Sequence, residues 1–200
     1  MNRIKLSLVA VIAALTMGAG QANAQEKPIT LGVKAGVNLS TFGGDMKDTK
    51  SAFKYQAGIT ADIHVTRNLY VLTGLEFQTK GAKYHSKSEA SIKYNPMYLQ
   101  LPVHLGYKVR LAPEMNFVVN AGPYVAYGIG GKAKGDGSSE AVFGDNKLKR
   151  LDYGVGGGIG VEFGKLCVNA GYDLGLRNIS DMKSFDVKNR NAYMTLGYKF

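Results

Sequence analysis

Apolar and polar residues alternate along much of the chain, and the pattern is clearest in its last stretch. Over residues 192–200 every second residue is apolar or aromatic, and Thr195 and Lys199 are among those between. Side chains of a β-strand point alternately to its two faces, so this stretch predicts a strand with one apolar face. A terminal strand without a partner leaves a bare hydrogen-bonding edge. Residues 29–40 alternate in the same way, and we expect the two segments to pair and close one sheet into a barrel.

Six further segments alternate, and the connections between them alternate in length. Long connections at one end and short turns at the other are typical of outer-membrane barrels. Most segments also reach the roughly 9 to 11 residues that a tilted membrane-spanning strand needs. The pattern predicts an all-β, eight-stranded antiparallel up-and-down transmembrane β-barrel. The six segments are 52–65, 69–80, 92–108, 115–130, 151–163 and 166–177, the long connections 41–51, 81–91, 131–150 and 178–189, and the short ones 66–68, 109–114 and 164–165.

The direction of the apolar face separates a membrane barrel from a soluble, lipocalin-like one, and three features favour an outward apolar face. Four alternate glycines on the polar face of 151–163 suit a crowded lumen. Aromatic residues lie near strand ends on the apolar face, as in interface girdles. Charges of both signs are nearly balanced on the polar face, as a paired internal network requires. The predicted lumen charge network comprises Lys34, Lys54, Asp62, Glu76, Lys80, Asp152, Glu162, Asp173 and Arg177, and Lys108 and Lys199 lie on the same polar face.

The first 24 residues follow a different pattern. Arg3 and Lys5 precede an apolar run over 6–17, and small residues lead to Ala24. This order is that of a cleaved secretory signal, and the run is shorter than the roughly 20 residues of a spanning helix. We expect a signal peptide at 1–24 and an outer-membrane barrel domain at 25–200. Loss of Arg3 and Lys5 lowers the formal charge from +10 to +8.

The charge and the single cysteine narrow the choice of partners. Cys167 has no second cysteine to pair with, and the alternation predicts a buried thiol. The positive excess is spread over loops, turns and strands rather than forming a stripe, so we expect no nucleic-acid partner. A group of cations flanks the long connection 131–150 and could contact lipopolysaccharide phosphates, although a solvated loop accounts for it more simply. These cations are Lys132, Lys134, Lys147, Lys149 and Arg150.

The candidates for catalysis are weak. His64 and His104 are predicted to point inward at different heights and to form hydrogen bonds there, whereas His85 falls in a loop. No Ser-His-acid arrangement is evident at the rim. Residues 128–133 resemble a dinucleotide fingerprint but open no helix. We therefore expect no enzymatic activity, no cofactor and no metal.

Two prolines predict an irregular seam between 92–108 and 115–130. Proline cannot donate a ladder hydrogen bond, and a closed barrel has no free edge. Folding about a turn at 111–112 pairs Pro102 with Ala121 and Pro123 with Gln100. We expect a bulge or a ladder gap there.

Five short runs resemble the PorT-type outer-membrane β-barrel family of Bacteroidetes, whose barrels are OmpX- or OmpA-like. The resemblance covers nearly all of the mature chain and implies an eight-stranded barrel surrounded by outer-membrane lipid and lipopolysaccharide. It also implies that the barrel-assembly machinery recognises Phe200 as an assembly signal, and it implies no common activity. The runs are 72–77, 98–103, 120–124, 152–156 and 196–200.

The leading hypothesis is a non-enzymatic integral outer-membrane barrel that is structural or interacts through its extracellular loops, for example with another envelope protein. An eight-stranded lumen is just wide enough for side chains. Tyr70, Tyr98, Tyr124 and Tyr193 can fill it, although the glycines of 151–163 can leave a small void. A narrow pore for small solutes and a soluble exported barrel that binds a small apolar ligand are the alternatives.

Overall fold

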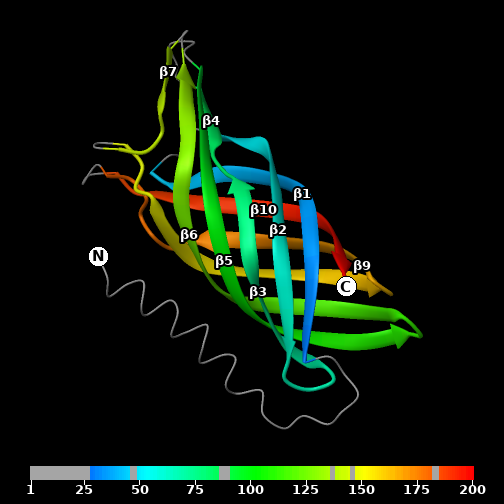
Figure 1. Cartoon of the computed structure of the whole chain (residues 1–200). Coiled ribbons are helices and arrows are strands. Elements are labelled where there is room, and N and C mark those ends of the chain that lie inside the picture. The colour runs from blue at the N-terminus through cyan, green and yellow to red at the C-terminus, as the bar shows by residue number, and fades with distance from the viewer. Residues whose placement is uncertain (1–27, 46–48, 86–90, 136–137, 145–146, 182–184) are drawn as a thin grey trace.

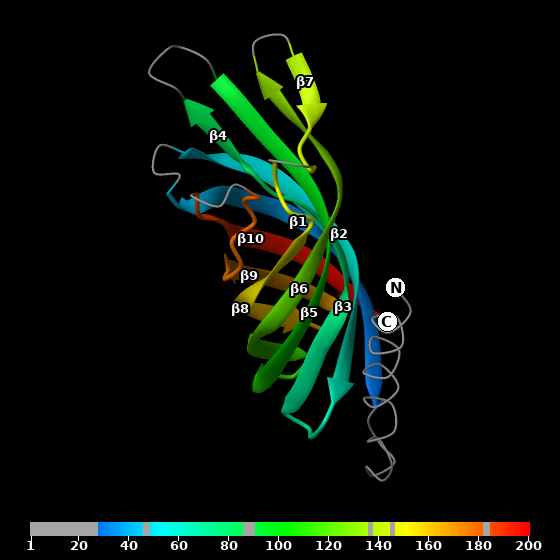
Figure 2. The same ribbon diagram turned by 90° about the vertical axis from the view of Figure 1, so that its left-hand side faces the viewer.

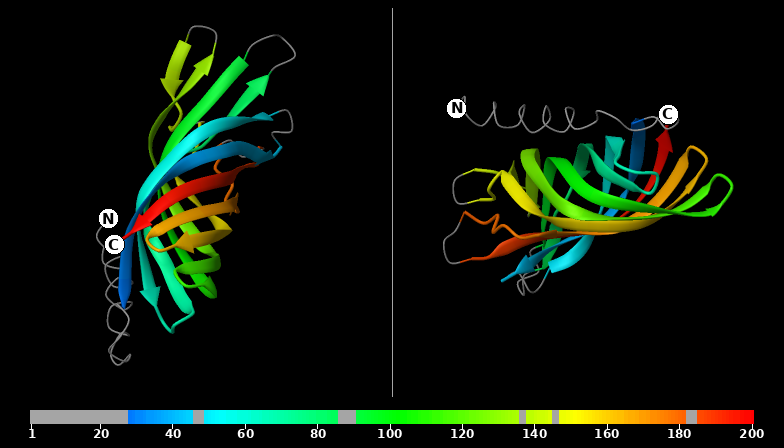
Figure 3. Two further views of the ribbon diagram at one scale, coloured as in Figure 1. Left: turned by 90° about the vertical axis from the view of Figure 1, so that its right-hand side faces the viewer. Right: turned by 90° about the horizontal axis from the view of Figure 1, so that it is seen from below.

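The computed structural model describes residues 28–45, 49–85, 91–135, 138–144, 147–181 and 185–200, so the signal peptide predicted at 1–24 lies outside the described residues. One antiparallel sheet curls into a ring (Figures 1 and 3), which confirms the predicted eight-stranded barrel. β4 and β7 extend the ring at one end. The strands are β1 (Ile29–Gly44), β2 (Thr49–His64), β3 (Leu69–Thr79), β4 (Ala82–His85), β5 (Ser91–Ala112), β6 (Met115–Gly135), β7 (Ser138–Ala141), β8 (Leu151–Phe163), β9 (Leu166–Gly175) and β10 (Val187–Lys199).

The first and last strands close the ring, as their matching alternation predicts. β1 pairs with β10 from Gly32 opposite Lys199 to Gly44 opposite Val187. The backbone N–H of Phe200 donates to the carbonyl of Leu31 at 2.9 Å. The first and last strands are therefore hydrogen-bonded to each other, and neither has a bare edge.

Apolar side chains point out of the barrel and polar ones point into it. Val33 and Leu196 are 43% and 59% exposed, whereas Glu76 and Asp152 are buried. Leu99, Leu101 and Val103 are partly exposed and alternate with the buried residues of β5. The predicted orientation is confirmed, and the soluble barrel with an apolar interior is wrong. Among the described residues no helix is long and apolar enough to cross a membrane.

The two ends of the barrel differ. The short-turn end carries the connections 65–68, 113–114 and 164–165, and the long-loop end carries all the others. At the long-loop end the hairpins β4–β5 and β6–β7 rise beyond the remaining strands (Figures 1 and 2).

The strands run further into the predicted loops than the alternation indicated. The connection predicted at 131–150 holds the end of β6 and all of β7, which pair from Lys132 opposite Ala141 to Gly135 opposite Ser138. The connection predicted at 81–91 holds β4, so His85 belongs to a strand and not to a loop. In these hairpins polar residues form the backbone hydrogen bonds of a strand but make no continuous apolar face. The alternation that predicts a spanning strand is therefore missing there.

The predicted ladder gap between β5 and β6 is confirmed, but the predicted register is wrong. Pro102 pairs with Tyr124 and Leu105 with Ala121, and the two residues between them on each of these described strands form no ladder pair. The hairpin turns at residues 113–114 and not at 111–112, because Glu114 adopts a left-handed φ of 64°. This tighter, later turn moves the partner of Pro102 from Ala121 to Tyr124.

Candidate functional site: the filled lumen

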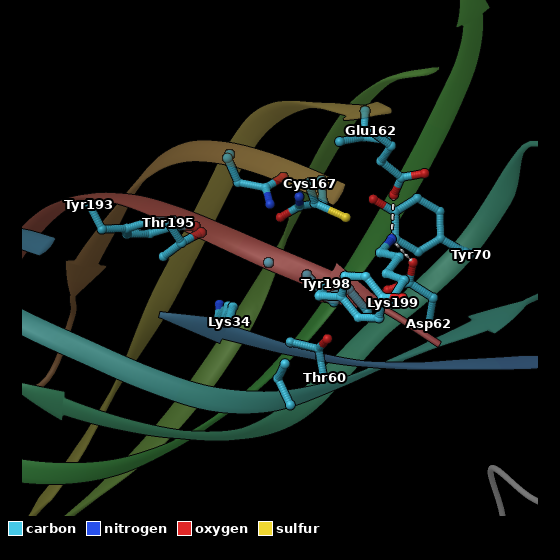
Figure 4. Close-up of a pocket in the computed structure, with 17 residues that line it drawn as sticks. Lys34, Thr60, Asp62, Tyr70, Glu162, Cys167, Tyr193, Thr195, Tyr198 and Lys199 are labelled. Atoms are coloured by element: carbon cyan, nitrogen blue, oxygen red, sulfur yellow. Dashed lines mark hydrogen bonds and ion pairs between the residues drawn. The ribbon is translucent and has the colours of Figure 1, made fainter. Parts of the chain in front are cut away.

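Two lysines and two carboxylates form one cluster near the short-turn end, and Figure 4 shows three of these residues, Lys199, Asp62 and Glu162. Lys108 Nζ lies 3.2 Å from Asp62 Oδ2 and 3.3 Å from Glu162 Oε2. Lys199 forms salt bridges with the same two carboxylates. The ring of Tyr70 lies against this cluster, with its centroid 4.7 Å from Lys108 Nζ. Four strands, β2, β5, β8 and β10, are thus joined across the lumen.

A second layer of ions lies closer to the middle of the barrel. Lys34 Nζ is 2.6 Å from Glu76 Oε1, and Gln78 Nε2 donates to Glu76 Oε2 at 3.0 Å. Asp173 Oδ2 accepts a hydrogen bond of 3.1 Å from Gln100 Nε2. Each of these carboxylates is buried and is engaged by a donor, as a charge removed from water requires.

A third layer combines an ion pair with aromatic rings. Lys80 Nζ is fully buried 3.6 Å from Asp152 Oδ2 and donates to Gln100 Oε1 at 2.8 Å. The same ammonium lies 5.4 Å from the ring centroid of Tyr98 and 4.7 Å from that of Tyr124. Both rings are buried, so this layer occupies the full width of the lumen.

Apolar residues close the lumen at the long-loop end. Phe143 packs edge-on against Tyr98, with ring centroids 5.6 Å apart. The Arg150 guanidinium lies 5.3 Å from the Phe143 ring centroid and donates to the carbonyl of Gly128 at 2.8 Å. We call this closure the apolar cap; it comprises the buried residues Val142, Phe143, Leu148 and Ile179.

The structure brings seven of the nine predicted network residues together and leaves two apart. Lys54 forms a hydrogen bond with Asn95, and the Arg177 guanidinium lies 5.7 Å from the ring centroid of the outward-facing Tyr153. The seven residues in the layers are Lys34, Asp62, Glu76, Lys80, Asp152, Glu162 and Asp173.

The apolar cap does not follow from the sequence pattern, because the alternation marks residues 131–150 only as a long connection. The available signal was a short apolar run, Ala141 to Phe143, with Leu148 close behind it in an otherwise polar stretch. Backbone hydrogen bonds fix the run: Leu148 N–H donates to the Val142 carbonyl at 3.1 Å, and Lys149 N–H donates to the Ile179 carbonyl at 2.7 Å.

Between the layers the remaining space is small, whereas a cavity of about 820 Å³ lies at the short-turn end, lined by residues that include Arg67, Lys165 and Phe200. A cavity of about 50 Å³ lies between Tyr193, Thr195 and Lys34 on one side and the Tyr70 cluster on the other (Figure 4). This is room for one or two water molecules. Gly158 and Gly171 border Tyr193, whose hydroxyl lies 3.2 Å and 2.4 Å from the places where a Cβ would stand. The glycines therefore accommodate the large side chains instead of leaving a channel.

His64, His104 and Cys167 are part of this packing. His104 Nδ1 is 2.9 Å from Asn120 Oδ1 in the interior, and His64 Nε2 is 3.2 Å from Thr30 Oγ1. Cys167 is buried. In the part of the chain that the structure describes, no three His, Cys, Asp or Glu side chains gather in a way that could hold a metal ion.

Residues 21–181 match the family model described as outer membrane protein beta-barrel domain. The chain belongs to this family. It is therefore a protein of the outer membrane, where lipid and lipopolysaccharide surround its apolar face. In such barrels the short turns are periplasmic and the longer loops extracellular, so the long-loop end faces outward from the cell.

Solved outer-membrane proteins of this size are similar to the chain. Neisserial surface protein A is 14% identical over 87% of this chain and 100% of its own, with a TM-score of 0.48. Ail, the attachment invasion locus protein of Yersinia pestis, is 15% identical over 87% and 100%, with a TM-score of 0.46. The N-terminal barrel domain of Pseudomonas aeruginosa OprF is 11% identical over 88% and 100%, with a TM-score of 0.41. No curated protein matches the chain.

Proposed function

We propose that the protein is a closed, non-enzymatic barrel that supports the outer membrane structurally and contacts other molecules through its long-loop end. The observation that carries this proposal is the filled lumen: three layers of paired charges and rings lie beneath the apolar cap. Such a barrel exposes its outer face to lipid and its long-loop end to the outside medium, and its filled lumen blocks the passage of solutes.

Planar-bilayer recordings test whether the barrel is closed. The refolded protein is expected to give no steady single-channel current. A variant in which alanine replaces the rings of all three layers and of the apolar cap is expected to conduct, because no layer then keeps a large ring across the lumen; the rings are those of Tyr70, Tyr193, Tyr98, Tyr124 and Phe143. A steady current from the unaltered protein would overturn the proposal and favour the narrow pore.

The pairing of the lumen carboxylates with lysines supports a structural rather than a catalytic role for these residues. Asp62 and Glu162 each contact two lysines, and Glu76 contacts one. Neutralising one of these carboxylates would leave the charge of its lysine partner without a counter-ion. These carboxylates therefore serve to hold strands together.

We also propose a narrower family, a cleaved signal peptide at 1–24 and a role for Phe200 in assembly. The resemblance of the five runs named above supports a PorT-type barrel of Bacteroidetes. A signal peptide at 1–24 is supported by its basic start, apolar middle and small-residue end, and N-terminal sequencing of the mature protein tests cleavage after Ala24. Phe200, exposed at the short-turn end, suits recognition by the barrel-assembly machinery.

A further inference from the structure

A row of lysines crosses the raised hairpins at the long-loop end. In the strand register Lys50 of β2 is opposite Lys83 of β4, Lys83 is opposite Lys93 of β5, and Lys93 is opposite Lys134 of β6. Residues directly opposite each other in antiparallel strands share a face, with Cβ atoms about 5 Å apart. We call these four register positions the lysine row.

Lys93 and Lys134 of the lysine row lie on the outer face of the hairpins. Tyr94 and Ala133, which follow Lys93 and precede Lys134, line the same cavity inside the mouth as Phe42. Since successive side chains of a strand alternate faces, Lys93 and Lys134 point the other way, toward the surroundings of the barrel. Lys50, Lys93 and Lys134 are exposed, and so is Lys132, two residues before Lys134 on β6.

Acidic residues do not balance this row among the described residues of the two hairpins. Glu140 of β7 is the one carboxylate there, and it is 3.1 Å from Lys147. Like charges directly opposite each other destabilise strand pairing, so an anion that lies against the row would stabilise the hairpins.

The position of the row identifies the anion. Lys93 lies four residues beyond Met97 on β5, and Lys134 lies four residues beyond Gly130, the residue of β6 opposite Met97. Positions four apart on a strand share a face, and Met97 belongs to the outward series of Leu99 and Leu101. Four residues of a strand span about 13 Å. The lysines therefore continue the lipid-facing surface just above its apolar band, at the level of lipid headgroups.

We propose that the lysine row binds the phosphate groups of lipopolysaccharide in the surrounding outer leaflet. The proposal rests on the placement of the long-loop end outside the cell, and it names the lipid that the outer face of that end contacts. It does not depend on whether the lumen conducts, so the bilayer recordings and the experiment below can fail independently.

Native mass spectrometry of the detergent-solubilised barrel with purified lipid A tests this proposal. The unaltered protein is expected to retain bisphosphorylated lipid A and to lose this preference when the phosphates are removed from the lipid. In the variant with Lys50→Gln, Lys93→Gln and Lys134→Gln the affinity is expected to fall on the order of 100-fold, at roughly fivefold for each lysine.

A variant with the same charge change at the other end is the control. Arg67, Arg110 and Lys165 are exposed at the short-turn end, and their replacement by glutamine is expected to leave the affinity for lipid A unchanged. Heat-modifiable migration in electrophoresis shows that each variant is folded. Equal binding of the lysine-row variant and the unaltered protein would overturn the proposal. So would equal binding of dephosphorylated lipid A, or full displacement of lipid A by a soluble sulfated polysaccharide, which would assign the row to a polyanion from outside.

Discussion

The ring of Phe143 lies directly over Gly128, so that a Cβ at position 128 would stand 2.3 Å from Phe143 Cζ. The apolar cap can therefore close only because β6 has no side chain at this point. We predict that Gly128→Ala expels Phe143 from the mouth and lowers the free energy of unfolding by about 1–3 kcal/mol, the usual cost of overpacking. Urea unfolding in lipid vesicles measures this loss.

Gly130 provides the matched control on the same strand. A Cβ at this position would lie 3.5 Å from Met97 Cε, an ordinary contact. Gly130→Ala is expected to leave the cap in place and its cleavage by added protease unchanged, whereas Gly128→Ala is expected to expose residues 142–148 to cleavage. If both variants resisted the protease equally, Phe143 would not depend on Gly128.

The pair formed by Lys34 and Glu76 tests the lumen charges. Lys34→Met leaves a buried carboxylate without its cation, and we predict a loss of about 3–5 kcal/mol in the free energy of unfolding. The double variant Lys34→Met with Glu76→Leu is expected to recover most of this loss, because neither charge is then buried alone. Equilibrium unfolding of the single and double variants gives both values.

The exposed pair Lys147–Glu140 is the control for this comparison. Its two side chains are largely in solvent, so Lys147→Met is expected to cost less than about 1 kcal/mol. A similar cost for Lys34→Met would mean that the lumen is wet enough to screen its charges.

The barrel itself follows from the sequence because lipid imposes a strict period of two. Val33 and Lys34 must face lipid and lumen respectively, and a shift by one residue would exchange them. The lumen charges follow from the same rule, since the polar face has nowhere else to point. The seven residues of the layers are therefore predictable as inward-facing, although their individual partners are not.

The register of β5 and β6 and the apolar cap do not follow from the alternation. The register depends on which residue of the turn adopts a left-handed φ, and Glu114 gives no such signal in the sequence. The cap depends on contacts between Phe143 and Tyr98, which lie 45 residues apart and have no common periodicity. Lys54 and Arg177 have the right parity, but Lys54 is within reach of Asn95 on β5, and Arg177 lies two residues beyond the end of β9, beside Tyr153.

Charge on the outer face is predicted to be costly in proportion to its depth in the membrane. Met194 is opposite Val37 near the middle of β1 and β10, and its side chain is exposed to lipid. We predict that Met194→Arg lowers the free energy of unfolding in vesicles by about 2–4 kcal/mol. Leu31→Arg, on the same face close to the short-turn end, is expected to cost about 0–1 kcal/mol, as interfacial positions do. Equal costs at the two positions would contradict the placement of the membrane around the barrel.

Phe200 is predicted to act in assembly more than in stability. Its ring packs against Tyr198 at a centroid distance of 5.6 Å, and the residue is 57% exposed, so its loss removes little packing. We expect Phe200→Ser to slow the appearance of the heat-modifiable, folded form in vesicles that contain the assembly machinery, while the free energy of unfolding changes by less than about 1 kcal/mol. Phe163→Ser alters another exposed ring at the end of β8, at the same side of the barrel, and is expected to assemble at the normal rate. Equal rates for the two variants would show that the terminal position has no special part in assembly, since both remove one exposed aromatic ring.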